Sequence, residues 1–298
     1  MRPTTSDYFK LHFIVFLWGS TAIFGVLISI PAVEMVFYRT LLASVGMVIL
    51  IFLTNGLFKV TAKDLFKIVF TGFIIGAHWI LFFAAAKVSN VSVSLVGYAT
   101  CTLWVALIEP AIYKQKVKAL EIFLGFAIIA GLYVIFSSDF KFQTGLLLAI
   151  GSGLTAAIFS VINSKFVKRM PAYTITLYEM IGACLGTFLF FPFYKILWAE
   201  GNTLQLTPTA IDWMYIAVLA IVCSVYAYSV SVELMKRLSV FFIQLTFSLE
   251  PVYGIVMALI IFGAKEQMGI NFYLGAAVIV VSVIAYPFLK RILYRSQS

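Results

Sequence analysis

The chain has 298 residues, of which 63% are hydrophobic and only 11% are charged. Soluble domains are about half apolar and about one quarter charged, so the composition excludes a soluble globular protein and indicates one that lies almost wholly within a membrane. The formal net charge of +9 would suggest a nucleic-acid partner for a soluble chain, but in a membrane protein a basic excess sets topology, and we expect no nucleic-acid partner. All three cysteines lie inside apolar runs, which predicts packing roles, no disulfide and no metal site.

Apolar stretches long enough to cross a bilayer as helices, which takes roughly 17–25 residues, follow one another along the whole chain. We expect ten of them, at residues 11–30, 32–54, 66–87, 90–113, 120–137, 143–164, 174–197, 212–234, 240–263 and 270–289. The first is one of ten, so it is not read as a signal peptide. The connections are short, and the longest runs from about Ala199 to Asp212. The sequence therefore predicts an all-α integral membrane protein without a soluble domain.

Lysine and arginine are distributed unevenly between these connections. With the N-terminus placed inside, sixteen basic residues fall on the inside and only four on the outside, namely Lys87, Lys141, Lys195 and Lys265. Positively charged loops stay cytoplasmic, so both termini are predicted to be cytoplasmic in a multi-pass protein of the inner (cell) membrane. Missing or adding one span midway would scramble this ratio, which supports ten spans independently of hydropathy.

The second half of the chain repeats part of the first. The segment Pro31–Gly46 reappears as Pro171–Gly186, with proline, alanine, tyrosine and glycine in step. The one charge near the middle of each copy changes sign, because Arg39 in the first copy corresponds to Glu179 in the second. This exchange makes the two residues candidates either for pairing with each other or for gripping the two ends of a zwitterion.

Further matches keep the same order, such as residues 21–29 with 156–164. They predict a duplicated unit of five helices, with a first repeat at residues 1–138 and a second at 139–298. An odd number of spans forces the second copy to insert upside down. Inverted repeats are typical of secondary transporters, whose substrate site lies near the bilayer midplane between the halves.

Three charged residues stand deep inside predicted spans. A charge at the centre of a membrane helix costs about 2.5–3.5 kcal/mol on insertion scales, so it usually faces a cavity or a partner. Arg39 could bind a substrate carboxylate through its planar fork, or form a structural ion pair. Glu179 and Glu250 could each bind a substrate amine, carry a proton or neutralise Arg39. Pro251 removes a backbone hydrogen bond beside Glu250, which predicts a helix kink.

A set of polar aromatic residues also falls on these predicted helices. His78 has no second ligand three or four residues away, so it does not predict a metal site. It could instead bond a substrate, relay a proton or be satisfied within the core. The candidates for lining a substrate cavity are Trp18, Tyr38, Arg39, His78, Trp79, Tyr98, Tyr178, Glu179, Tyr228, Gln244 and Glu250. Amphipathic rings suit an organic metabolite better than a phosphate, although an aromatic stripe is also what packing alone produces.

Several short motifs resemble one known family. They are Trp18 to Ser20, Pro31 to Arg39, Ala84 to Ser92, Leu249 to Pro251 and Gly263 to Glu266. In this order the chain resembles, over essentially its whole length, the drug/metabolite transporter superfamily and within it the EamA family of ten-helix permeases. The resemblance implies alternating access and a cavity lined by the first four helices of each repeat. It also implies substrates such as amino acids, related metabolites and amphipathic drugs. The first half departs from the pattern, because Thr100 and Cys101 stand where the repeat would place Glu-Pro.

We therefore predict a permease that moves a small organic metabolite outward, foremost an amino acid or a related amphipathic compound. Its partners are the small-molecule substrate and the lipid bilayer, as a monomer or homodimer, and both proton-coupled and facilitated transport stay open. We expect no cofactor, no metal and no enzyme activity. One alternative is a nucleotide-sugar or phosphometabolite transporter, which would want several cations at mid-depth, where only Arg39 stands. The others are a membrane-embedded lipid-modifying enzyme, which would want clustered acids, and a scaffold or sensor.

Overall fold

The computed structural model describes residues 3–116, 119–136, 142–247 and 249–294, and every regular element within them is a helix. In chain order the helices of the first half are α1 (Thr5–Gly19), α2 (Thr21–Leu27), α3 (Ala32–Leu53), α4 (Ala62–Val88), α5 (Val91–Tyr98), α6 (Cys101–Tyr113) and α7 (Ala119–Phe136). Those of the second half are α8 (Gln143–Phe166), α9 (Ala172–Leu197), the 3₁₀ turn η2 (Glu200–Asn202), α10 (Ala210–Val218), the π-helix η3 (Leu219–Tyr226), α11 (Ala227–Leu234), α12 (Val240–Phe247), α13 (Glu250–Phe262), the 3₁₀ turn η4 (Gly263–Glu266) and α14 (Ile270–Tyr294).

Eight helical segments of the described residues are long and apolar enough to cross a membrane. They are Thr5–Leu27, Ala32–Leu53, Ala62–Val88, Val91–Tyr113, Gln143–Phe166, Ala172–Leu197, Ala210–Leu234 and Val240–Glu266. The fifth and tenth predicted spans fall on α7 and α14, which are apolar over the shorter stretches Ala119–Gly131 and Ile270–Ser282. The chain is thus a multi-pass helical membrane protein.

The helices begin where local chemistry favours a start. Thr4 and Thr209 each form a reciprocal capping box, with Asp7 and Asp212 respectively, and these boxes satisfy free N–H groups in the first turns of α1 and α10. Pro31 and Pro171 are the N-cap residues of α3 and α9. The repeated proline seen in the sequence therefore marks the start of the same kind of long helix in each half.

Four of the eight segments are interrupted part of the way along. α1 gives way to α2 at Ser20, α5 to α6 at Ala99 and Thr100, and α12 to α13 next to Leu249. Between α10 and α11 the chain forms the π-helix η3. Irregular backbone at membrane depth is tolerated where it is buried in protein or lines a cavity, so these interruptions point to the region where a cavity is found.

The interruption beside Pro251 differs from the predicted kink. Pro251 lies in the first turn of α13, where its missing N–H has no partner to lose, so the proline starts a new helix instead of bending a continuous one. The matching interruption before Cys101 needs no proline, although Cys101 precedes Pro251 by the repeat offset of 150 residues. The break is therefore kept by packing in the half that lacks the Glu-Pro pair.

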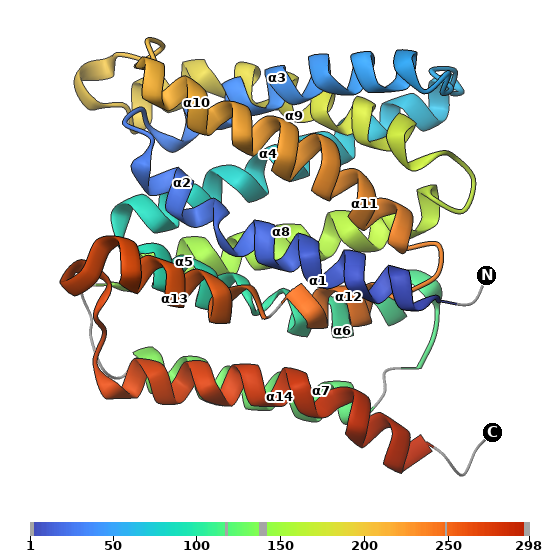
Figure 1. Cartoon of the computed structure of the whole chain (residues 1–298), viewed down its shortest axis with the longest axis vertical. Helices are drawn as coiled ribbons and strands as arrows, with labels where there is room; N and C mark the ends of the chain where they lie inside the picture. Colours follow the sequence, from blue (N-terminus) through green and yellow to red (C-terminus); the bar gives the residue numbers. More distant parts are fainter. Residues whose placement is uncertain (1–2, 117–118, 137–141, 248, 295–298) are drawn as a thin grey trace.

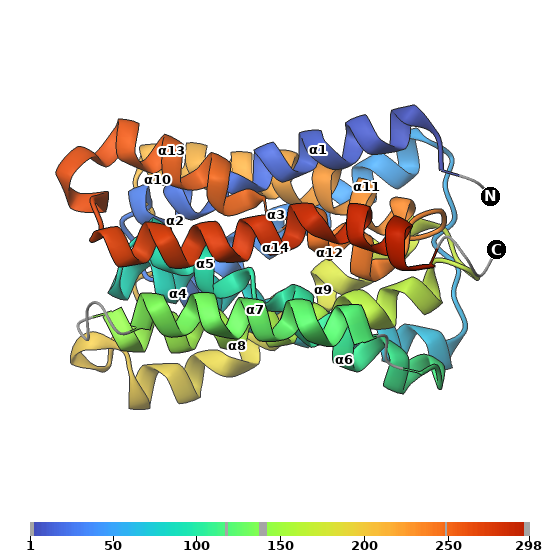
Figure 2. The same cartoon turned by 90° about the horizontal axis from the view of Figure 1, so that it is seen from below.

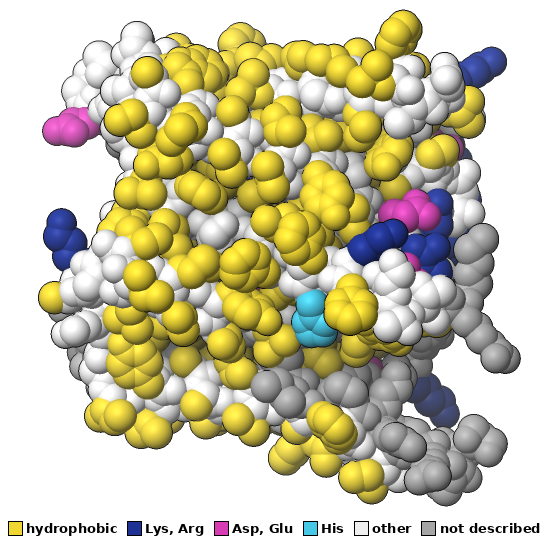
Figure 3. Space-filling model, viewed as in Figure 1, with side chains coloured by type: hydrophobic (Ala, Val, Ile, Leu, Met, Phe, Trp, Pro, Cys, Tyr) yellow, Lys and Arg dark blue, Asp and Glu magenta, His cyan; other side chains and the backbone are white. Residues whose placement is uncertain are grey.

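The helices run roughly parallel to one long direction, and the start of α1 and the end of α14 lie at the same end of the bundle (Figures 1 and 2). α7 and α14 pack against each other and form a layer at one side of the bundle (Figure 1). Large apolar side chains cover the middle of the face in Figure 3, and charged ones gather towards the helix ends. This distribution fits a surface that meets lipid along its middle and water at its ends.

α4 and α9 cross at backbone contact distance. A Cβ atom on Gly182 would overlap the Val69 carbonyl oxygen, and one on Gly72 would overlap the Glu179 carbonyl oxygen. Small residues allow such close approach in membrane helices, where dispersion contacts take the place of a hydrophobic driving force. The crossing places Glu179 at the centre of the bundle.

Candidate functional site

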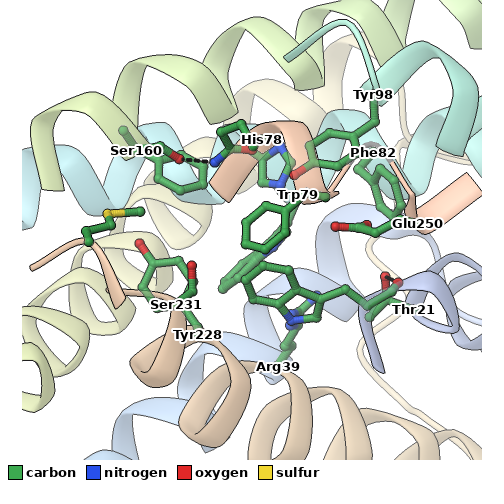
Figure 4. Close-up of a pocket in the computed structure, with 15 residues that line it drawn as sticks. Thr21, Arg39, His78, Trp79, Phe82, Tyr98, Ser160, Tyr228, Ser231 and Glu250 are labelled. Atoms are coloured by element: carbon green, nitrogen blue, oxygen red, sulfur yellow. Dashed lines mark hydrogen bonds between the residues drawn. The ribbon is translucent and has the colours of Figure 1, made fainter. Parts of the chain in front are cut away.

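A cavity lies where the interrupted helices meet (Figure 4). Its walls come from both halves of the chain, and they are formed by Trp18, Thr21, Arg39, His78, Trp79, Phe82, Tyr98, Phe159, Ser160, Tyr228, Ser231, Met235, Gln244, Phe247 and Glu250. The space between these side chains is about 590 Å³, of which about 50 Å³ is open to the centre of a water molecule. As it stands the cavity fits a small ligand, and a larger one would need the helices to separate.

Eight of the eleven residues proposed from the sequence line this cavity. They come from several helices and are Trp18, Arg39, His78, Trp79, Tyr98, Tyr228, Gln244 and Glu250. The structure thus brings together residues that are far apart in the chain, from Trp18 in the first span to Glu250 near the end of the second half.

Tyr38 and Tyr178 do not line the cavity, and the prediction that they do is wrong. The Tyr38 hydroxyl donates to the Leu206 carbonyl oxygen at 2.7 Å, and the Tyr178 hydroxyl donates to the Phe58 carbonyl oxygen at 2.8 Å. Each tyrosine thus ties its helix to a connection outside the cavity. Successive residues of an α-helix point about 100° apart, so a helix that turns Arg39 inward turns the adjacent Tyr38 away.

Among the described residues that line the cavity, Arg39 is the only lysine or arginine. Its side chain is 2% exposed, and its Nε donates to the Ser224 hydroxyl at 2.9 Å. The guanidinium carbon lies 3.9 Å from the centre of the Trp79 ring, a cation–π contact. In the part of the chain that the structure describes, no carboxylate pairs with it. A buried charge without a counter-ion is costly, so the site is prepared for an anionic group.

Glu250 supplies the opposite charge. Its side chain is 3% exposed, and its Oε1 has no hydrogen-bond partner among the described residues. It stands in the first turn of α13, where the partial positive charge of a helix N-terminus favours a carboxylate. Figure 4 shows its carboxylate turned into the cavity, which Arg39 enters from another helix. The two ends of a zwitterion would therefore each meet a complementary charge.

The π-helix η3 holds two of the cavity side chains in place. Trp18 Nε1 donates to the Cys223 carbonyl oxygen at 3.0 Å, and Arg39 donates to Ser224 in the next position. Single-turn π segments often mark functional sites, because the altered hydrogen-bond spacing redirects backbone groups. Ser224 was missed at the level of the sequence, since hydropathy and spacing do not distinguish a π-helix from an α-helix.

Other polar side chains of the cavity are satisfied within the protein. Gln244 Nε2 donates to the Ser160 hydroxyl at 2.7 Å, and the Cys101 thiol donates to Gln244 Oε1 at 3.3 Å. His78 Nδ1 lies 3.0 Å from the Ser152 carbonyl oxygen. These groups have partners already, so they shape the wall of the cavity while Arg39 and Glu250 carry its unpaired charges.

Glu179 lies behind the cavity wall and is bonded to groups other than Arg39. Its Oε2 accepts hydrogen bonds from the Tyr228 hydroxyl at 2.9 Å and from Asn163 Nδ2 at 3.2 Å. Of the two arrangements proposed for Arg39 and Glu179, the direct ion pair is wrong. A grip on two ends of one ligand by these two residues is not supported either, because Glu179 does not line the cavity.

Comparison with known proteins adds an independent line of evidence. The chain matches the EamA-like transporter family over residues 8–137 and again over residues 143–286. It is 22% identical over 276 residues to a Bacillus subtilis (strain 168) protein named Uncharacterized transporter YxxF, in a match that covers 90% of this chain and 85% of the relative. A crystal structure superposes on 99% of this chain and 100% of its own with a TM-score of 0.72 and 15% identity, a likeness that shows the fold alone.

Proposed function

Because the chain belongs to the EamA-like transporter family, we propose that it moves a small zwitterionic metabolite, such as an amino acid, through the cavity between Arg39 and Glu250. The observation that carries the proposal is the presence of two buried, opposite charges in one cavity, neither of which pairs with a charge among the described residues. Transport by a multi-pass membrane protein is what family membership supports, and the substrate class is our inference.

Each part of the cavity contributes to recognition in this proposal. The planar guanidinium of Arg39 matches a carboxylate through two parallel hydrogen bonds, and Trp79 beneath it keeps it in place. Glu250 accepts hydrogen bonds from the ammonium group of the ligand. The rings of Trp18, Phe82 and Phe159 give the apolar part of the ligand a surface to pack on. Aromatic walls with a few polar anchors are typical of small-molecule sites.

We further propose that residues 1–138 and 139–298 are inverted repeats that rock about the cavity, with both termini cytoplasmic and the metabolite leaving the cell across the inner membrane. Two observations support this part. The family matches the chain twice, once on each side of that boundary. The interruptions before Cys101 and Pro251 also stand 150 residues apart, at corresponding places in the two halves. Broken helices near the midplane are a common feature of transporters with inverted repeats.

The alternative substrates fit the cavity less well. A nucleotide sugar or phosphorylated metabolite carries two or more negative charges, and Arg39 is the one lysine or arginine among the described lining residues. For a membrane-embedded lipid-modifying enzyme, the family and the named relative point the other way, towards a transporter.

Solute counterflow in liposomes tests the proposal. Vesicles that contain the purified protein and a high internal concentration of one unlabelled amino acid should take up the labelled form, and a panel of amino acids, amines and carboxylates defines the class. Arg39→Gln and Glu250→Gln should each weaken binding roughly a hundredfold, because losing one partner of a buried charged contact costs about 2–5 kcal/mol.

The matched control is Glu200→Gln, the same exchange at an exposed glutamate in the η2 connection. It should leave counterflow and substrate affinity unchanged. Absence of counterflow and of thermal stabilisation by every zwitterion in the panel would refute the proposal.

A further inference from the structure

Glu179 is a fully buried carboxylate at the core of the bundle. Its side chain is 0% exposed, and its Oε2 accepts from both Tyr228 and Asn163. The other oxygen, Oε1, has no hydrogen-bond partner among the described residues. Asn163 Oδ1 is a second buried atom of the same cluster without a partner in that part of the chain. The cluster therefore has one free acceptor on Asn163 and one oxygen of Glu179 that could carry a hydrogen.

The surroundings of Glu179 contain no cation that contacts it within the described part of the chain. α9 packs against α3, α4 and α11, and α8 contributes Asn163. At the depth of the cavity the titratable groups of these neighbours are Arg39 on α3, His78 on α4 and Tyr228 on α11. Arg39 bonds Ser224 and His78 bonds Ser152, so of these three groups only Tyr228 bonds Glu179.

This geometry describes a neutral carboxylic acid. An ionised carboxylate taken out of water without a counter-ion costs several kcal/mol, and such a group neutralises instead. As an acid, Glu179 uses Oε2 as the carbonyl oxygen that accepts from Tyr228 and Asn163. Oε1 then carries the proton, for which Asn163 Oδ1 is the unfilled acceptor of the cluster.

Tyr228 joins this cluster to the cavity. Its ring lines the cavity, and it meets the Trp79 ring edge-on at 6.3 Å between centroids, while its hydroxyl holds Glu179. Trp79 in turn lies under the Arg39 guanidinium. A ligand carboxylate that engages Arg39 therefore acts on a ring packed against Tyr228, and movement of Tyr228 removes a hydrogen bond from Glu179 and opens it to cavity water.

We propose that Glu179, held by Asn163 and Tyr228, is a proton-carrying site that couples proton entry to metabolite exit. The inference rests on the proposed function and adds the co-transported ion. In one orientation the Oε1–H bond breaks, the proton passes to a cavity water, and the carboxylate keeps the hydrogen bonds from Tyr228 and Asn163. In the other orientation the carboxylate takes a proton from water on the opposite side. One proton thus moves inward for each metabolite that moves outward.

The test compares wild type with Glu179→Gln and with Glu34→Gln in liposomes. Glu34 is the matched control, because it is also 0% exposed but bonds the Gln205 backbone N–H and does not line the cavity. Two readouts are needed. Counterflow without a pH gradient reports metabolite movement alone, and accumulation against a gradient reports coupling. A pH difference of one unit can support about tenfold accumulation of a net-neutral metabolite, since each factor of ten corresponds to about 1.4 kcal/mol.

Wild type and Glu34→Gln should show both counterflow and pH-driven accumulation, and they should release a proton when substrate is added to the purified protein. Glu179→Gln should retain measurable counterflow but lose the accumulation and the proton release. Tyr228→Phe keeps the ring and removes the hydroxyl, so it should lower the accumulation ratio even if Glu179→Gln does not fold. Wild-type counterflow that ignores the pH gradient would overturn this inference and leave the proposed function standing. Accumulation retained by both variants would also overturn it, whereas no wild-type counterflow with any zwitterion removes both proposals.

Discussion

Replacing Glu266 should weaken the fold at a point well away from the cavity. Glu266, at the end of η4, accepts hydrogen bonds from the Val91 backbone N–H at 2.9 Å, the Ser92 backbone N–H at 3.1 Å and the Ser92 hydroxyl at 2.8 Å. Its side chain is 3% exposed. It therefore caps α5, the short helix that carries Tyr98 to the cavity wall, from a distant part of the sequence.

The expected cost follows from these contacts. A hydrogen bond to a charged group contributes about 1.5–3 kcal/mol, and a buried donor left unpaired costs about 1–3 kcal/mol. The terms are not additive, so Glu266→Ala should lower the free energy of unfolding by roughly 3–5 kcal/mol. Glu266→Gln keeps one acceptor oxygen in the same place and should cost roughly half as much.

Thermal unfolding of the purified protein in one detergent measures the difference. Glu200→Ala is the control, because Glu200 is an exposed glutamate at η2, in another connection, and its loss should change stability by less than about 0.5 kcal/mol. A cycle with Ser92→Ala separates the hydroxyl bond from the two backbone bonds. If Glu266→Ala and Glu200→Ala unfold at the same temperature, the capping role assigned to Glu266 is wrong.

Three further predictions concern the helices and the cavity. Gly182→Ala should prevent close packing of α4 and α9 and cost roughly 1–3 kcal/mol or more. In contrast, Gly151→Ala, whose new Cβ would meet only Leu81 at 3.5 Å, should be tolerated; equal stability of the two variants would refute the close crossing. Tyr38→Phe should leave counterflow intact and cost about 1 kcal/mol of stability, and a loss of transport without a loss of stability would place Tyr38 in the site after all. Ser224→Ala should weaken substrate binding roughly tenfold or more, since it removes a bond of about 1.5–3 kcal/mol from Arg39, and unchanged affinity in a thermal-shift titration would argue against that role.

Most of the helices could be predicted from the sequence because their causes are local. Long apolar stretches force the backbone to satisfy its own hydrogen bonds in lipid, and the caps at Thr4, Thr209, Pro31 and Pro171 mark where helices begin. The predicted starts and ends nevertheless differ from the structure by several residues. The first span begins at Thr5, where the prediction placed residue 11, because the capped first turns of α1 extend beyond the apolar core of the span.

The candidate site was predicted residue by residue but not as an arrangement. Arg39 and Glu250 stood out because an isolated charge in a membrane helix has few bland explanations. Tyr38 and Tyr178 were chosen for their chemistry and their repeated position, yet both turn away from the cavity. One residue of error in helix rotation is enough to reverse inside and outside, and hydropathy does not fix rotation when every face of the helix is apolar.

The sequence by itself determined that this chain is a helical membrane protein with a repeated pattern and a few charges inside its spans. Only the tertiary structure decided which of those charges share a cavity. Arg39 bonds Ser224 and lies on Trp79, Glu250 faces the same space from α13, and Glu179 is held apart by Tyr228 and Asn163. The physical reason is that local sequence sets the propensity and length of each helix. Its rotation and its partners depend on the packing of side chains far apart in the chain, such as Gly72 and Gly182 at the crossing of α4 and α9.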